Sequence, residues 1–431
     1  MIKDAMRSLK DDKARAVFFA LTFYLTSTLM FLFFNMAESA SGGKAEIYET
    51  NGMANLMLLL EQGNIGNLMM VFIVIMCAID IVFTNDFYVN NKAKELGVRM
   101  ISGATYTQLA GFLLIQTSVM LAIAVPLGIL SALALIPVFN SILIHSGSAF
   151  TITVQSYALM EYFAVIIMII LWTVMLNMSF AFRSPANVLL SADRRQVSKK
   201  QGFAGTFRST LGLLVHIFFI GLYLVPIYNF FQGSSGFAVN AILGCAGMNH
   251  IIAELLPKWI SHYNKKKRMN DPERAIANGF LRQDLVLTRM TIFLYVGDLA
   301  VLLSMMFGRH NNEVENMLVL ISYVFIAVLQ AMAMMFRLDT ELSMRRKQFT
   351  ILKQTGFSKE QRSGIMTREI LGYYGAVLLI VGIYLAAIMI SLLTKGQISP
   401  VRSLVLTAIS IVPLGVTCFL SLRYYHTVVT E

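Results

Sequence analysis

Ten long runs of apolar residues follow one another along the chain, separated by short polar segments. Each run comes close to or exceeds the roughly 20 residues that a helix needs to cross the hydrocarbon of a bilayer. The runs do not alternate between apolar and polar positions, which favours helices over the strands of a barrel. The pattern therefore predicts an all-α polytopic membrane protein with ten transmembrane helices, at residues 16–36, 68–87, 106–139, 156–182, 209–231, 236–258, 290–308, 317–336, 360–394 and 401–425.

Composition supports the same class. Hydrophobic residues make up 57% of the 431 residues and charged residues 14%, and the mean hydropathy is +0.67. These values are far more apolar than those of a soluble protein. The three cysteines, Cys77, Cys245 and Cys418, each lie inside an apolar run. Their placement favours small core residues over disulfides or metal ligands.

The net charge of +11 is unevenly placed along the chain. Only Lys44, Arg309, Lys395 and Arg402 lie in segments expected outside, and the other basic residues lie in or beside segments that share the opposite side. This is the positive-inside bias, and it predicts a multi-pass protein of the cell (plasma) membrane with both termini cytoplasmic. The basic face then meets membrane lipid, and nucleic acid is not an expected partner. Residues 1–15 fit an amphipathic helix on the inner leaflet.

An internal repeat divides the chain. When Lys94 is aligned with Lys347, Gly103 falls on Gly356, Gln108 on Gln361 and Gly111 on Gly364. Each copy belongs to a four-span pattern, and the two spans between the copies belong to neither. The predicted organisation is an N-terminal amphipathic helix (1–15), a first four-helix unit (16–193), a linker with two transmembrane helices (194–289) and a second four-helix unit (290–431).

The first copy carries a recognisable motif. Residues 94–104, KELGVRMISGA, followed by a long span, resemble the signature of the FtsX-like permeases. Glu95, Gly97, Arg99 and Gly103 take the acidic, glycine, arginine and glycine positions of that signature. The second copy, residues 347–356, is similar to the variant in bacitracin-exporter-type permeases, which share the ten-helix layout. This copy has Gln348 and Thr350 where the first has Glu95 and Gly97, so the two copies are unequal.

The resemblance implies the permease subunit of a type VII ABC transporter. Such a subunit couples ATP hydrolysis by a separate cytoplasmic ATPase to export or membrane extraction of a substrate, here expected to be a hydrophobic or antimicrobial-type peptide of a bacterial resistance system. The resemblance also implies that the segment after the second span of each unit binds the ATPase, which gives two ATPase copies. The candidate ATPase-coupling residues are Lys92, Lys94, Glu95, Arg99, Gly103, Arg345, Arg346, Lys347, Gln348, Lys353 and Gly356.

The two segments can be interpreted as helix ends or as ordinary loops. Gly103 and Gly356 suit helix C-caps that let the chain turn back into the membrane. The bland alternative is that both segments are ordinary cytoplasmic loops that obey the positive-inside rule, and charge alone favours this alternative. The matched repeat favours the coupling role.

Catalytic and nucleotide-binding motifs are missing from the sequence. The chain contains no G-x-x-x-x-G-K-[ST] motif, so no P-loop holds nucleotide. Neither a Ser-His-Asp arrangement nor an HExxH motif is visible. We therefore expect a non-catalytic subunit that binds no cofactor and no metal, with ATP and Mg²⁺ held by the partner ATPase.

Five ionisable residues inside the apolar runs are intramembrane polar candidates, because charge is costly in hydrocarbon and often functional there. They could contact substrate or relay protons, or simply hydrogen-bond between helices. Glu369 has Arg368 beside it, which favours a structural pair or a side chain that reaches toward the interface. The five are Asp80, His216, Glu254, Asp298 and Glu369.

One departure from the bacitracin-exporter type leaves the function open. Those permeases carry a large extracellular domain between the seventh and eighth spans, whereas residues 309–316 are too few for a domain, as are residues 37–67 in the first unit. A second hypothesis is therefore a non-transporting mechanotransmission or peptide-sensing module, with a sensor histidine kinase as a further candidate partner. A third, a secondary transporter, rests only on Asp80 and Asp298.

Overall fold

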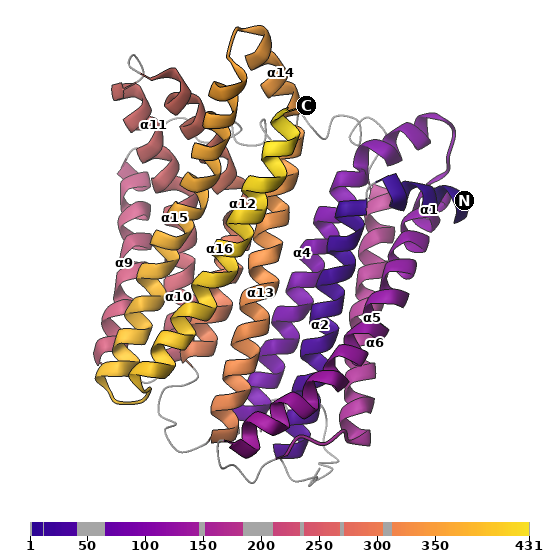
Figure 1. The fold of residues 1–431 in the computed structure, drawn as a ribbon, viewed down its shortest axis with the longest axis vertical. Coiled ribbons are helices and arrows are strands. Elements are labelled where there is room, and N and C mark those ends of the chain that lie inside the picture. The colour runs from indigo at the N-terminus through magenta and orange to yellow at the C-terminus, as the bar shows by residue number, and fades with distance from the viewer. Residues whose placement is uncertain are drawn as a thin grey trace. The chain divides into compact units, whose positions relative to one another are not determined.

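The computed structural model describes residues 2–11, 13–40, 65–145, 151–183, 210–232, 237–267, 271–304 and 313–430. Within these ranges the regular structure is entirely helical (Figure 1). Ten helices in the described part of the chain are long and apolar enough to cross a membrane. The predicted all-α polytopic class is confirmed. The short connections and the basic stretch 194–208 that the sequence places between spans lie mostly outside the described residues.

The chain folds as two compact units. The first contains α1 (Ile2–Asp11), α2 (Lys13–Ala40), α4 (Ile65–Ile101), α5 (Tyr106–His145) and α6 (Ser156–Arg183). The second contains α9 (Thr210–Gln232), α10 (Phe237–His250), a π-helical turn η1 (Ile251–Leu255), α11 (Leu256–Lys267), α12 (Pro272–Ser304), most of α13 (Glu313–Met344), α14 (Arg346–Gln354), α15 (Lys359–Thr394) and α16 (Pro400–Thr430).

Helix α2 forms the centre of the first unit and packs on α4, α5 and α6. It is apolar on all sides, as a helix surrounded by other helices should be. Its contact with α5 uses small and hydroxyl-bearing side chains: Ser27 lies against Gly128, and Thr28 donates to the Gly128 carbonyl at 3.2 Å. A methyl group on Gly128 would meet the Tyr24 carbonyl oxygen at 2.9 Å. Close approach over a small residue with hydroxyl hydrogen bonds is the usual way in which membrane helices associate.

Helix α12 has the corresponding place in the second unit, where it packs on α10, α11 and α15. It begins at Pro272, well before the span predicted to start at 290, so the segment expected as a cytoplasmic loop is helical on both sides of residues 268–270. The local sequence explains this start. Pro272 occupies the first helical position, where its missing N–H costs nothing, and the Asp271 carboxylate accepts from the Arg274 N–H at 3.3 Å as an N-cap.

The two spans that the sequence assigns to a linker pack within the second unit. Helices α9 and α10 lie against each other, and α10 also lies on α12. A methyl group on Gly247 of α10 would meet the backbone of α9 at 2.6–2.9 Å. Tyr384 of α15 donates to the Ala241 carbonyl at 3.0 Å, which adds a hydrogen bond between α10 and α15.

Candidate functional site

Each unit carries a helix–turn–helix at the matched positions of the repeat. We call residues 92–108 the first element and residues 345–361 the second element. In Figure 1 the α4–α5 turn and the α14–α15 turn each lie at one extremity of their own unit. These turns are the segments that the sequence singled out.

The first element ends its helix through glycine. Gly103 has φ +94°, a left-handed conformation that favours glycine. The N–H of Ala104 donates to the Arg99 carbonyl at 3.0 Å, and the N–H of Gly103 donates to the Met100 carbonyl at 3.1 Å. This pair of bonds is a Schellman motif, which satisfies carbonyls that the helix end leaves open.

The second element repeats this ending. Gly356 also has φ +94°. The N–H of Phe357 donates to the Leu352 carbonyl at 3.1 Å, and the N–H of Gly356 donates to the Lys353 carbonyl at 3.2 Å. The chain therefore leaves both helices by the same geometry, which is the geometry that the glycine C-cap prediction requires.

The following helices also start alike. In the second element the Ser358 N–H donates to the Gln361 side chain at 2.9 Å, and the Gln361 N–H donates to the Ser358 hydroxyl at 3.2 Å. Thr105 and Gln108 make the same reciprocal pair in the first element, at 3.0 and 3.4 Å. These are capping boxes, and they fix the direction in which each long span leaves its turn.

The elements differ at the other end. Helix α4 continues from its span to Ile101 without interruption. In the second unit α13 ends at Met344 and α14 begins at Arg346, so Arg345 stands at a break between the two helices. The first element is thus a continuation of its span, and the second is a short separate helix.

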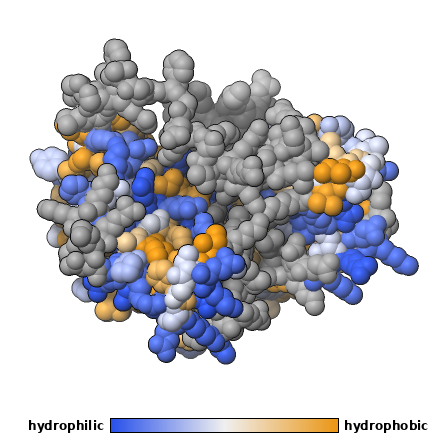
Figure 2. Space-filling model, turned by 90° about the horizontal axis from the view of Figure 1, so that it is seen from above, coloured by the Kyte–Doolittle hydropathy of each residue, from blue (hydrophilic) through white to orange (hydrophobic). Residues whose placement is uncertain are grey.

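Each element presents an exposed aliphatic side chain at one matched repeat position, and the first element also exposes Ile101. Val98 is 57% exposed and Ile351 is 56% exposed. Two residues earlier, at matched positions, Leu96 and Phe349 face inward and are buried. Among the coloured residues in the view from above, hydrophobic side chains lie between hydrophilic ones (Figure 2). Charge is the conspicuous feature of these segments in the sequence and does not single out Val98 and Ile351, although their equal spacing from Gly103 and Gly356 is visible there.

A buried lysine fastens the first element to α1. Lys92 is 2% exposed and donates to the Ser8 hydroxyl at 2.8 Å and to the Glu95 carboxylate at 3.1 Å. Ser8 in turn donates to Glu95 at 2.8 Å, and Arg99 donates to the other oxygen of Glu95 at 3.0 Å. Burial on its own raises the pKa of Glu95, but the hydrogen bond from Ser8 and the charge and hydrogen bond of Lys92 outweigh it, so the pKa lies below the ordinary glutamate value.

A buried arginine fastens the second element to α12 and α15. Arg345 is 3% exposed and pairs through its two terminal nitrogens with Glu369 of α15 and Asp284 of α12, both fully buried. Its guanidinium also lies 4.7 Å from the ring centroid of Phe280. A guanidinium matches two carboxylates better than an ammonium does, because its donors form a planar fork.

These two clusters occupy corresponding places in the repeat. The alignment that sets Gly103 on Gly356 also sets Lys92 on Arg345 and Gln116 on Glu369. Gln116 is fully buried and donates to the Ala5 carbonyl of α1 at 3.2 Å. We call the set Lys92, Ser8, Glu95 and Gln116 the first latch, and the set Arg345, Asp284 and Glu369 the second latch.

The latches change the interpretation of two predicted coupling residues. Lys92 and Arg345 were expected on the docking surface but are buried instead, because each is held by partners on other helices. Glu95 and Arg99 are partly exposed, and the Arg99 guanidinium lies 4.0 Å from the Phe112 ring centroid. Gln348 and Lys353 are exposed. The side chains of Lys94, Arg346 and Lys347 lie outside the described part of the structure.

Two of the intramembrane candidates meet through a lysine. His216 of α9 hydrogen-bonds His250 of α10 at 2.8 Å between ring nitrogens, and Lys258 lies 2.7 Å from the other nitrogen of His216. Lys258 also pairs with Glu254 at 3.7 Å, within one turn of the π-helical segment. This cluster ties the hairpin of α9 and α10 together.

The other candidates are buried in separate places. Asp298 is 1% exposed and accepts from Gln330 of α13 at 2.8 Å, and Asp80 of α4 is 5% exposed. Glu369 does not pair with its neighbour Arg368, because consecutive residues of a helix point in different directions. Arg368 instead pairs with Glu273 at 3.3 Å, and Glu369 faces inward toward Arg345.

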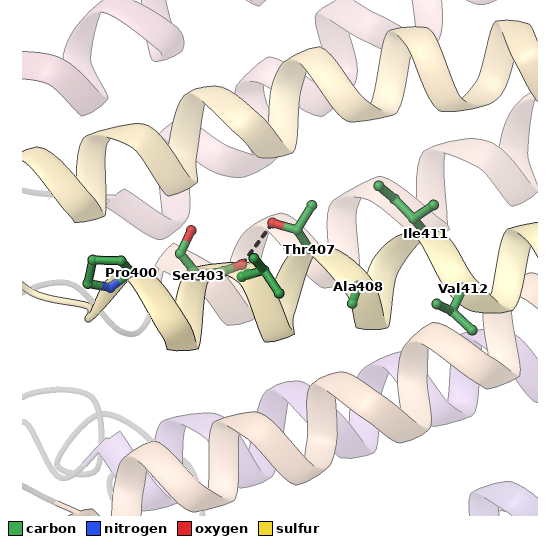
Figure 3. Close-up of a pocket in the computed structure, with 7 residues that line it drawn as sticks. Pro400, Ser403, Thr407, Ala408, Ile411 and Val412 are labelled. Atoms are coloured by element: carbon green, nitrogen blue, oxygen red, sulfur yellow. Dashed lines mark hydrogen bonds between the residues drawn. The ribbon is translucent and has the colours of Figure 1, made fainter.

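A hollow of 510 Å³ along one flank of α16 is lined mainly by apolar side chains (Figure 3). Its lining comes from α16 alone, between Pro400 and Val412. The Thr407 hydroxyl is used inside the protein, where it donates to the Ser403 carbonyl at 2.8 Å. The hollow is a shallow apolar surface.

The fold defines a polytopic helical membrane protein whose two elements end in the same way. Comparison with protein families adds one match: residues 67–186 match the family described as FtsX-like permease C-terminal. The matched region contains nearly all of α4, and the whole of the first element, α5 and α6. The match suggests an ABC transporter permease component. A search of curated proteins gives no match.

Proposed function

We propose that this chain is the permease subunit of a type VII ABC transporter, and that a separate cytoplasmic ATPase drives it through the two elements. The observation that carries the proposal is the repeated Schellman ending and capping box at Gly103 and Gly356. A loop that only connects two spans does not need the same backbone geometry twice. A surface that must present the same contact twice does.

Docking rests on Val98 and Ile351, the exposed aliphatic residues at matched positions of the two elements. Covering such an exposed aliphatic side chain with a partner is favourable, because apolar surface leaves water. Charged side chains around it add orientation and speed of association more than affinity. One ATPase copy binds each element, which gives two copies per chain, and ATP and Mg²⁺ are bound by these subunits.

The latches transmit the motion. An element that is pushed by a partner moves its spans only if it is joined firmly to them. In the first unit the continuous α4 provides this joint, and Lys92 adds α1 to it. In the second unit the helix is broken at Arg345, and the ionic contacts to α12 and α15 bridge the break. Motion of either element therefore reaches more than one span.

The cargo in this proposal is a hydrophobic or antimicrobial-type peptide that is exported or extracted from the membrane. The support for a peptide is the resemblance of the second copy to bacitracin-exporter-type permeases. The other function under consideration is a peptide-sensing module that signals to a histidine kinase and moves no peptide. Both functions use the same elements and the same ATPase, and both place the basic side of the protein in the cytoplasm.

The test is purification of the tagged chain from the membranes of its own host, with and without substitution of the exposed aliphatic residues. We expect an ABC ATPase to co-purify with the wild-type chain and to be lost with Val98→Asp combined with Ile351→Asp. The matched control is Leu404→Asp, which replaces an exposed aliphatic residue on α16. An ATPase that stays bound to the double variant, or is absent from the wild type, would contradict the proposal.

Cargo movement is tested on the same complex in proteoliposomes. A labelled apolar peptide that leaves the bilayer only in the presence of ATP supports transport. ATP hydrolysis that responds to the peptide without moving it favours the signalling function.

A further inference from the structure

A polar pocket lies between α4 and α6 of the first unit, apart from both elements. Its volume is 360 Å³. Its polar lining includes Asn85, Asp86 and Asn177, together with Ser179, and its apolar walls include Phe83, Val89 and Phe180. None of these polar residues was among the intramembrane candidates.

The amide of Asn177 is unusual for a buried group. Asn177 is 0% exposed, and neither its oxygen nor its nitrogen has a hydrogen-bond partner among the residues that the structure describes. The side-chain oxygen of Asn85, which is 2% exposed, also has no partner. Buried polar groups in proteins are nearly always satisfied, so an unsatisfied amide and a second unsatisfied amide oxygen lining one pocket point to a polar ligand. The occupant must both donate and accept hydrogen bonds.

The position of the pocket points to the lipid headgroup region. The apolar spans of α4 and α6 end at Asn90 and Phe182, respectively. At 1.5 Å per residue, Asp86 and Asn177 lie roughly 6 to 8 Å inside those ends. Basic residues follow both of these span ends in the sequence. The pocket therefore lies at the depth of the predicted inner-leaflet headgroups. Apolar side chains next to the polar group suit the start of an acyl chain.

We propose that this pocket binds the headgroup of an aminophospholipid such as phosphatidylethanolamine. The primary ammonium donates to the exposed Asp86 carboxylate and to the amide oxygens, and the phosphate oxygens accept from the Asn177 amide nitrogen. A zwitterionic headgroup supplies both kinds of partner at once, whereas a carboxylate in the lining disfavours a purely anionic headgroup. Lipid is the occupant favoured by position, because acyl chains surround the helices at this depth.

The experiment uses the purified full-length chain in detergent, without any ATPase. The protein is offered equal amounts of phosphatidylethanolamine, phosphatidylcholine and phosphatidylglycerol with identical acyl chains, and the retained lipid is weighed by native mass spectrometry. Phosphatidylcholine keeps the positive charge but has no N–H group to donate. We expect phosphatidylethanolamine to be retained over phosphatidylcholine by about tenfold, the ratio for loss of one charged hydrogen bond.

The variants locate the binding. Asn177→Leu and Asp86→Asn should each reduce the preference to less than about twofold. Asp86 is exposed, so its substitution leaves the helix packing intact even if Asn177→Leu disturbs folding. The control is Glu161→Gln. Glu161 lies on α6, about 24 Å along the helix from Asn177, and its substitution should keep the lipid preference.

Three results would overturn the proposal. They are equal retention of the three lipids by the wild type, a preference that survives both variants, and displacement of the lipid by an apolar lysine-containing peptide. Because neither nucleotide nor ATPase is present, these results leave the proposed coupling function untouched.

Discussion

Lys92 and Arg345 occupy the same repeat position but are neutralised in different ways. Lys92 is compensated by Glu95 on its own helix and by the Ser8 hydroxyl of α1. In the second element Gln348 stands at the position of Glu95, and the acids come from two other helices, as Asp284 and Glu369. The acid that the second copy lacks locally is therefore supplied through tertiary structure.

Replacing Arg345 tests the second latch. Arg345→Ala leaves two carboxyl groups buried without a cation, so we expect the free energy of unfolding to fall by roughly 3–5 kcal/mol. The measurement is chemical unfolding in detergent micelles. Lys353→Ala, at an exposed position of the same element, should change it by less than about 0.5 kcal/mol. Equal effects of the two substitutions would show that Arg345 is not a structural cation.

An apolar replacement of the whole cluster separates stability from coupling. Arg345→Met combined with Asp284→Leu and Glu369→Met removes every charge, and well-packed apolar residues often restore the stability of a buried ion cluster. We expect this variant to fold. We also expect its complex with the ATPase to lose part of the ATP hydrolysis that responds to peptide, because the break before α14 is no longer bridged by ionic contacts.

Glu95 makes the first latch dependent on pH. Its pKa is lower in the folded protein than in the unfolded chain, so its contribution is complete above the ordinary glutamate pKa and is lost as pH falls through the folded value. We expect α1 to stay packed at neutral pH and to loosen only below about pH 4.3. Cross-linking of cysteines placed on α1 and α4 measures this packing. Glu95→Gln should remove the acid transition, and a transition that persists in this variant would assign it to another group.

At the scale of the element, glycine decides where each helix stops. The sequence predicts Gly103 and Gly356 as C-caps, and the structure gives both the left-handed backbone that a C-cap glycine adopts. The sequence could not show which side of the element faces outward. Lys92 looks like a surface residue in its charged segment, and only the arrival of α1 from a distant part of the chain buries it. Asp284 and Glu369 are likewise remote from Arg345 in sequence.

Substitution of the two glycines tests the repeated turn. A non-glycine residue in this conformation is strained by roughly 1–2 kcal/mol, so Gly103→Ala and Gly356→Ala should lower the thermal midpoint of unfolding. Gly279→Ala in the interior of α12, where the added methyl group meets no atom within 4 Å, should leave it unchanged or raise it slightly. Similar behaviour of all three variants would contradict the assigned turn geometry.

At the scale of the whole molecule, the sequence predicts the fold class and the helix content. Long apolar runs cross a membrane as helices, because a helix hydrogen-bonds its own backbone groups in lipid. The sequence does not predict the early start of α12, ahead of its span, or the pocket between α4 and α6. The first depends on the cap formed by Asp271 and Pro272, whereas the second depends on two helices that the sequence separates widely. Polar residues such as Asn85 and Asn177 are inconspicuous in a hydropathy profile. Only the structure shows that the Asn177 amide and the Asn85 amide oxygen are buried without partners in the described part of the chain.

In the proposed complex, Val98 and Ile351 both touch an ABC ATPase. The direct measurement places a photo-crosslinking amino acid at each position in turn, irradiates the cells and identifies the attached protein by mass spectrometry. A third position, Leu404, is 72% exposed on α16 and serves as the control. We expect attachment of the same ABC ATPase at Val98 and at Ile351, and none at Leu404. No attachment at either element, or equal attachment at Leu404, would contradict the proposal.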